Sequence, residues 1–183
     1  MVKKGEKKMN LLRTAIAIAL VPFVLGACVG TPPGVKPVDN FELDRYLGKW
    51  YEIARLDHDF ERGLNNVTAE YSMKDDGGVR VINRGYSSAD GWDEAEGKAY
   101  FVGESDIAHL KVSFFGPFYG SYIVFELEEN YQHAFISGPK TSYLWLLARQ
   151  PEVSDEVMQR FRSRATELGF DLEELIIVSH DDI

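Results

Sequence analysis

Side chains that could support catalysis or metal binding are scattered along this sequence of 183 residues. The four histidines, His58, His109, His133 and His180, fall in unrelated segments without the spacing of metal ligands, so we expect no metal site. Serine, histidine and aspartate are all present, but no Gly-x-Ser-x-Gly motif occurs. A hydrolase triad therefore has no support. The sequence predicts neither catalytic residues nor a cofactor.

Two single residues need a separate interpretation. Glu52 alternates with apolar residues in a predicted strand, where burial would raise the pKa of its carboxyl group. Glu52 could then perform acid–base chemistry on an apolar substrate, or it could make a structural hydrogen bond. Cys28 is the only cysteine, so neither an intramolecular disulfide nor a cysteine-based metal cluster can form.

Residues 1–27 have the pattern of a cleaved export signal. A basic stretch precedes an apolar run of twelve residues, 14–25, which is too short to span about 30 Å of hydrocarbon. The sequence Leu25-Gly26-Ala27-Cys28 resembles the lipobox of bacterial lipoproteins, and this implies lipidation of Cys28. Because Val29 rather than Asp follows the cysteine, the resemblance implies an outer-membrane anchor, with the domain facing the periplasm. An ordinary secretory signal is the alternative, and either Met1 or Met9 could be the start.

The remaining chain has the composition of one acidic globular domain. Without residues 1–27 it keeps 15 basic and 28 acidic side chains, a net charge of −13. This balance argues against a nucleic-acid partner, because phosphate binding needs a basic face. Residues 28–40 contain three prolines and predict an extended linker that reaches on the order of 35 to 40 Å. Residues 41–183 are predicted to form a single domain.

The pattern between residues 49 and 150 is typical of an all-β domain. Short apolar and aromatic runs alternate with clusters of Gly, Asp, Asn, Pro and Ser. Short connections predict an antiparallel up-and-down order, and eight such strands can remove their exposed edges by closing into a β-barrel. A filled two-sheet sandwich is the alternative. The predicted strands are 49–56, 66–73, 79–87, 94–102, 108–115, 121–128, 133–138 and 143–150.

A single helix is predicted after the last of these strands. Ser154 suits its N-cap and Gly169 its end, and acidic residues occupy the first turn. An apolar stripe would pack this helix on the outside of the barrel, and residues 175–179 are predicted to form a short final strand. The stripe consists of Val157, Phe161, Ala165 and Leu168.

Strand alternation predicts a barrel interior rich in small side chains. Alanine and glycine at inward positions, Ala54 among them, would leave a volume that a ligand fills, because protein interiors rarely contain large voids. The predicted ligand-binding residues are Ala69, Tyr71, Asn83, Ala99, Phe101, Val112, Phe114, Tyr122, Tyr143 and Trp145.

The first predicted strand opens with Gly48-Lys49-Trp50-Tyr51, which resembles the first signature of lipocalins. Asn130-Tyr131 and Arg149 match the other two signature regions in order and spacing, and residues 51–55, 60–64 and 111–120 look like bacterial outer-membrane lipocalins. The resemblance covers about residues 40–179. It implies an eight-stranded barrel with one helix outside. Four residues would be structural, and Arg149 would stack on the Trp50 ring. They are Gly48, Trp50, Tyr131 and Arg149.

The resemblance also implies a non-catalytic carrier of fatty acids or lysophospholipids. The alternatives are an enzyme that acts on a cavity-bound apolar substrate and a structural lipoprotein with a filled barrel. The sequence does not decide between a monomer and a homodimer. Phe115, Phe118 and Tyr119 lie beside a loop predicted at the open end, where they would contact ligand, bilayer or a second subunit, or fold back as a lid.

Overall fold

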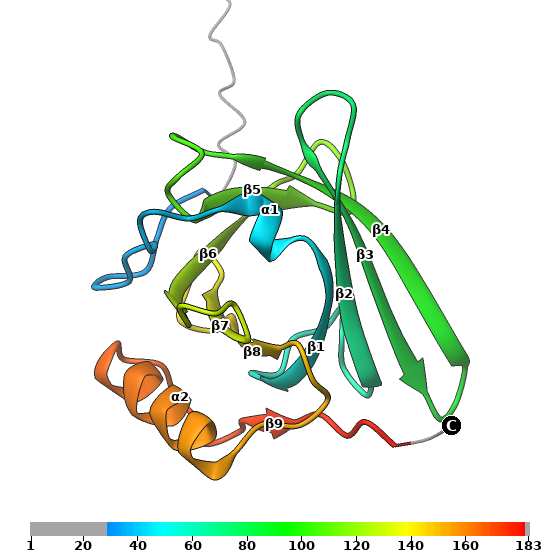
Figure 1. Cartoon of the computed structure of the whole chain (residues 1–183). Helices are drawn as coiled ribbons and strands as arrows, with labels where there is room; N and C mark the ends of the chain where they lie inside the picture. Colours follow the sequence, from blue (N-terminus) through cyan, green and yellow to red (C-terminus); the bar gives the residue numbers. More distant parts are fainter. Residues whose placement is uncertain (1–28, 182–183) are drawn as a thin grey trace, which may run out of the picture.

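Eight antiparallel strands close into a barrel in the computed structural model, which describes residues 29–181 (Figure 1). The strands are β1 (Gly48–Arg55), β2 (Asn65–Met73), β3 (Val79–Ser87), β4 (Gly91–Phe101), β5 (His109–Ser113), β6 (Gly120–Leu127), β7 (His133–Ser137) and β8 (Leu144–Ala148). Each strand pairs with the next, and β1 pairs with both β8 and β2, which closes the barrel. The predicted export signal and lipidated Cys28 lie outside the described residues.

The start of β4 and the inward face of β1 show the largest local differences from the prediction. Ser87 pairs directly with Gly91, so β4 begins three residues earlier than expected and the β3–β4 hairpin turn is short. Gly91 has a φ of 82°, which a tight hairpin turn accommodates most readily with glycine. The predicted inward position of Ala54 is wrong. The register of β1 against β8 shifts between Glu52 and Ala54, so Ala54 faces the outside of the barrel.

The helix α2 (Asp155–Glu167) covers one side of the outer face of the barrel. Its N-cap is Ser154, whose Oγ accepts a hydrogen bond from the Val157 backbone N–H at 3.4 Å. Phe161 and Ala165 of this helix are fully buried in an outer apolar cluster that includes Phe135 of β7. The final strand β9 (Ile176–Ile177) pairs with β1 outside the barrel, and it is shorter than predicted. Within residues 29–181, no helix has the length and apolar character needed to cross a membrane.

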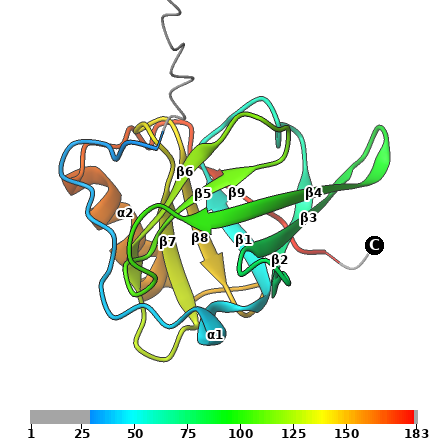
Figure 2. The ribbon, with the colours of Figure 1, turned by 90° about the horizontal axis from the view of Figure 1, so that it is seen from above.

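The chain before residue 41 lies against the barrel instead of forming a free tether. The Val38 N–H donates to the Val124 carbonyl at 2.9 Å, and the Ala108 N–H donates to the Val38 carbonyl at 2.9 Å. Val35 is buried in the outer cluster. Figure 2 shows the segment running along the outside of the barrel, from the end that carries the short helix α1 (Leu43–Tyr46) to the opposite end.

The α1 end of the barrel is closed by the signature residues. The Arg149 guanidinium carbon lies 3.9 Å from the centre of a Trp50 ring, so the stacking implied by the resemblance is present. Gly48 has a φ of 90°, where a side chain would strain the backbone. The Tyr131 hydroxyl accepts a hydrogen bond from the Glu42 N–H at 2.9 Å. Arg149 also donates to four backbone carbonyls, those of Arg45, Leu47, Lys49 and Tyr131.

Candidate functional site: the barrel cavity

The barrel contains an apolar cavity of about 100 Å³. Its wall comes from every strand of the barrel except β7, together with Phe41, α1 and the β1–β2 loop. Eight of the predicted ligand-binding residues line it, which brings together side chains separated by up to 76 positions in the sequence. They are Ala69, Tyr71, Asn83, Ala99, Val112, Phe114, Tyr122 and Trp145.

The other two predicted ligand-binding residues do not line the cavity. Phe101 ends β4 at the closed end, where its ring packs edge-on against Phe41 with 6.2 Å between centroids. Tyr143 precedes β8, outside the strand ladder to which the alternation applies, and its ring stacks on Trp145 at 6.1 Å. Both residues therefore support the ends of the cavity rather than its wall.

The inward glycines do not all create free space. A Cβ atom added to Gly97 would lie 2.8 Å from the Phe114 ring, and one added to Gly85 would lie 3.0 Å from the Leu64 side chain. These glycines therefore make room for neighbouring side chains. The cavity is therefore smaller than the small inward residues alone predicted. An apolar cavity of about 150 Å³ binds a molecule of benzene, so this cavity of about 100 Å³ has room for a few methylene groups and not for a bulky ring system.

Three tyrosine hydroxyls meet at the cavity wall. The Tyr122 hydroxyl oxygen lies 2.6 Å from the Tyr46 hydroxyl oxygen and 2.9 Å from the Tyr71 hydroxyl oxygen. Burial raises the pKa of all three phenols well above their usual range, so they stay uncharged at neutral pH. The two hydrogen bonds use two of the three hydroxyl protons, which leaves one to donate. The cavity thus offers a neutral polar group. Tyr46 is not among the predicted ligand-binding residues, because residues 43–46 were not predicted to be helical.

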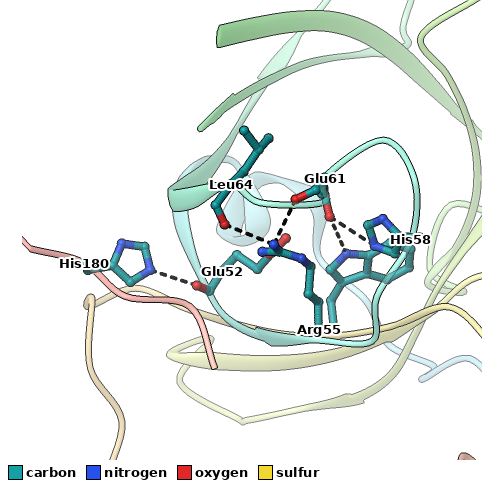
Figure 3. Close-up of polar contacts among 7 residues, drawn as sticks. Glu52, Arg55, His58, Glu61, Leu64 and His180 are labelled. Carbon is teal, nitrogen blue, oxygen red and sulfur yellow. Dashed lines mark hydrogen bonds and ion pairs between the residues drawn. The ribbon is translucent and has the colours of Figure 1, made fainter. Parts of the chain in front are cut away.

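A buried polar cluster lies at the opposite, open end of β1 (Figure 3). Arg55 donates from Nη1 to Glu52 Oε1 at 2.7 Å, and from Nη2 to the carbonyls of Glu61 at 2.8 Å and Leu64 at 3.0 Å. Glu61 Oε2 lies 3.1 Å from His58 Nε2 and accepts a hydrogen bond from Trp145 Nε1 at 3.1 Å. Glu52, Arg55, His58 and Glu61 are all at most 6% exposed.

This polar cluster fixes the loop between β1 and β2 over the cavity, which Glu52 and Glu61 both line. The Glu52 carboxyl is paired with Arg55, an arrangement that supports the structural interpretation of Glu52. The charged Arg55 within an otherwise apolar strand is the sequence signal that could have indicated this cluster. Among residues 29–181, no three His, Cys, Asp or Glu side chains are placed to hold a metal ion.

A model of the lipocalin-like domain matches residues 41–180. The chain belongs to the lipocalin family. It is 60% identical over 166 residues to the outer membrane lipoprotein Blc of Vibrio cholerae, and the alignment covers 90% of this chain and 97% of the relative. It is 55% identical to the outer membrane lipoprotein Blc of Escherichia coli K12, and that alignment covers 89% of this chain and 94% of the relative. The fold is similar to that of insecticyanin from the tobacco hornworm, with a TM-score of 0.67, 21% identity, and coverage of 84% and 88%.

These comparisons confirm several sequence predictions. The family, the closed eight-stranded barrel and the external helix are as expected. The close relatives are outer membrane lipoproteins, so this lipocalin is a lipid-anchored protein of the outer membrane. Family membership and the apolar cavity together support a lipid-binding barrel protein, and its relatives are binding proteins rather than enzymes.

The Glu52 carboxyl should give the lipocalin a distinctive pH dependence. Burial and, next, the nearby Glu61 charge raise the pKa of Glu52 well above its usual range, against the opposing effect of Arg55. A carboxyl group whose pKa is raised on folding binds its proton more tightly in the folded state. The free energy of unfolding therefore falls as the pH rises from the unfolded-state pKa to the folded-state pKa. Between pH 4 and 8, denaturant unfolding should show a smaller fall in this free energy for Glu52→Gln than for the unmodified protein.

The control for this comparison is Glu96→Gln on the outer surface of β4. Hydrogen bonding from Arg80 lowers the pKa of Glu96, so ionised Glu96 favours the folded state and its removal cannot reproduce the expected change. Identical pH profiles for the unmodified protein and Glu52→Gln would show that Glu52 does not carry this effect.

Proposed function

We propose that this lipocalin carries lipids with one acyl chain, fatty acids or lysophospholipids, in its barrel cavity while acyl groups on Cys28 hold it at the outer membrane. Such a carrier would store or transport these lipids during envelope maintenance, on the periplasmic side. The observation that carries the proposal is a mostly apolar cavity inside the barrel. It is closed at one end by Trp50 and Arg149 and reached between loops at the other.

The energetics favour a ligand with one chain. Each methylene moved from water into an apolar cavity gains up to about 0.8 kcal/mol, before the costs of ordering and incomplete burial. This gain applies to transfer from water into the cavity. Transfer from a bilayer gains no such free energy, because the chain is already in hydrocarbon there. Lipids that exist partly as monomers in water are therefore better cargo than diacyl lipids.

The polar groups near the cavity favour a lysophospholipid over a free fatty-acid anion. Glu52 and Glu61 line the cavity, and Arg55, the cation between them, is already engaged by Glu52 and two carbonyls. Asn83 Oδ1 is buried in the cavity wall without a hydrogen-bond partner. This neutral acceptor suits the free hydroxyl of a lysophospholipid backbone, whereas a carboxylate would face two acidic side chains.

The test uses the soluble protein with Cys28→Ser. We expect saturable binding of a fluorescent fatty acid and its displacement by lysophospholipid, with native mass spectrometry reporting the lipid retained on purification and whether the protein is a monomer or a homodimer. An absence of saturable binding would contradict the carrier and support a structural role. Turnover of a bound lipid that is lost in Glu52→Gln would instead support an enzyme.

A further inference from the structure

The lipid anchor leaves the barrel close to its mouth. The Gly30 carbonyl accepts a hydrogen bond from Ser121 Oγ at 2.8 Å, and the His109 ring is hydrogen-bonded to the Val29 backbone. Ser121 is the second residue of β6, directly after the β5–β6 loop at the open end. In Figure 2 the described chain begins at the end of the barrel opposite α1.

This attachment leaves almost no slack between the barrel and the membrane. Only Val29 separates Cys28 from Gly30, so the Cα atoms of Cys28 and Gly30 can lie at most about 7 Å apart. A free linker over residues 28–40 would have allowed the barrel to stand several tens of ångströms from the bilayer in any orientation. The docked segment instead holds the open half of the barrel beside the acyl chains.

The same end of the barrel presents exposed aromatic side chains. Phe115 is 77% exposed and Phe118 72% exposed in the β5–β6 loop, and Phe60 is 57% exposed in the β1–β2 loop. Neither Phe115 nor Phe118 lines the cavity. The Lys111 ammonium group lies 5.4 Å from the Tyr119 ring centre, a pairing suited to the boundary between lipid chains and head groups. Exposed apolar groups gathered in this way mark a contact surface.

Charge does not oppose contact with a bilayer at the β1–β2 loop. The carboxylates of Asp57 and Asp59 each lie 2.7 Å from the Arg62 guanidinium, which offsets part of the acidic charge of this loop. The β5–β6 loop, residues 114–119, carries no charged side chain. The exposed aromatic side chains of this loop therefore form an uncharged surface.

We propose that the mouth of the barrel lies directly on the membrane leaflet that holds the Cys28 acyl chains, with Phe115 and Phe118 inserted among its lipids. Cargo then passes between the leaflet and the cavity without crossing water. The orientation rests on lipidation of Cys28, and the route rests on the proposed carrier function.

The orientation can be tested in the full lipidated protein, in vesicles of phosphatidylethanolamine and phosphatidylglycerol. Lipidation occupies the sulfur of Cys28, so an introduced cysteine is the only free thiol for a bimane label. Phe118→Cys places the label at the mouth, and Glu129→Cys places it on an exposed loop at the closed end. Lipids with a nitroxide on the acyl chain should quench bimane at position 118 at least fivefold more strongly than at position 129.

Two results would overturn this orientation. One is equal quenching at the two positions, or stronger quenching at position 129. The other is disulfide-linked dimers through position 118 without quenching, which would show that a second copy of the chain covers the aromatic patch. Quenching does not require bound cargo, so this test can fail while the displacement assay on the soluble protein succeeds, and the reverse is also possible.

The transfer route has its own measurement. Phe115→Ser with Phe118→Ser should leave the displacement affinity of the soluble protein within about twofold, because neither side chain lines the cavity. In the lipidated protein the same two substitutions should slow the transfer of a fluorescent lysophospholipid between vesicle and cavity at least tenfold. An unchanged transfer rate would overturn the direct route.

Discussion

Replacing Arg55 with methionine is expected to lower the free energy of unfolding by about 3 to 5 kcal/mol at pH 7, the range observed when one partner of a buried ion pair is removed. Arg55 is 1% exposed and satisfies the Glu52 carboxylate and the carbonyls of Glu61 and Leu64. Methionine fills much of the volume but supplies no donor. The variant therefore leaves a buried carboxyl group and two buried carbonyls without their partner.

The matched control is Arg80→Met, which breaks a 2.7 Å ion pair with Glu96 between side chains that are 48% and 60% exposed. Such surface pairs contribute at most about 1 kcal/mol, so chemical denaturation should separate the two variants clearly. The loss in the double variant Arg55→Met with Glu52→Gln should be smaller than the sum of the two single losses, because both changes act on the same buried contact. Equal losses for the two arginine variants would show that the polar cluster does not fix the β1–β2 loop.

The barrel could be predicted because alternation and turn residues act locally. The closed end could also be predicted, since an up-and-down order brings Trp50, Tyr131 and Arg149 to the same end. The inward face of β1 could not be predicted throughout, because the register shift after Glu52 depends on how β8 pairs with it. One extra residue reverses the face of every later side chain, so Ala54 joins the outer cluster.

The path of the N-terminal segment was also beyond the sequence pattern. Its prolines predict an extended linker, but its position depends on hydrogen bonds to β6 and to the residue preceding β5, more than 60 positions away. The composition of a segment predicts its stiffness, but it does not predict the surface against which the segment packs. The same limit applies to Tyr46, whose hydroxyl reaches Tyr122 only because α1 folds across the end of the barrel.

Ala69→Phe is expected to weaken lipid binding on the order of 100-fold. Ala69 is a small inward residue of β2, pairs with Trp50 and Asn83, and lines the cavity about midway along the barrel. A phenyl ring there would exclude roughly four methylenes of an acyl chain from the deeper part of the cavity. At about 0.8 kcal/mol each, their loss amounts to about 3 kcal/mol, and 1.4 kcal/mol corresponds to a tenfold change in affinity.

Glu70→Phe provides the matched control, because the next residue of the strand points to the opposite, solvent-exposed face. It introduces the same side chain into the same strand and should leave the displacement affinity within about twofold. Ala69→Phe should retain cooperative unfolding, since the new ring enters existing space and overpacking typically costs only about 1 to 3 kcal/mol. A folded Ala69→Phe protein with unchanged affinity would mean that the lipid does not occupy the barrel, because no acyl chain can pass a ring at this point without losing depth.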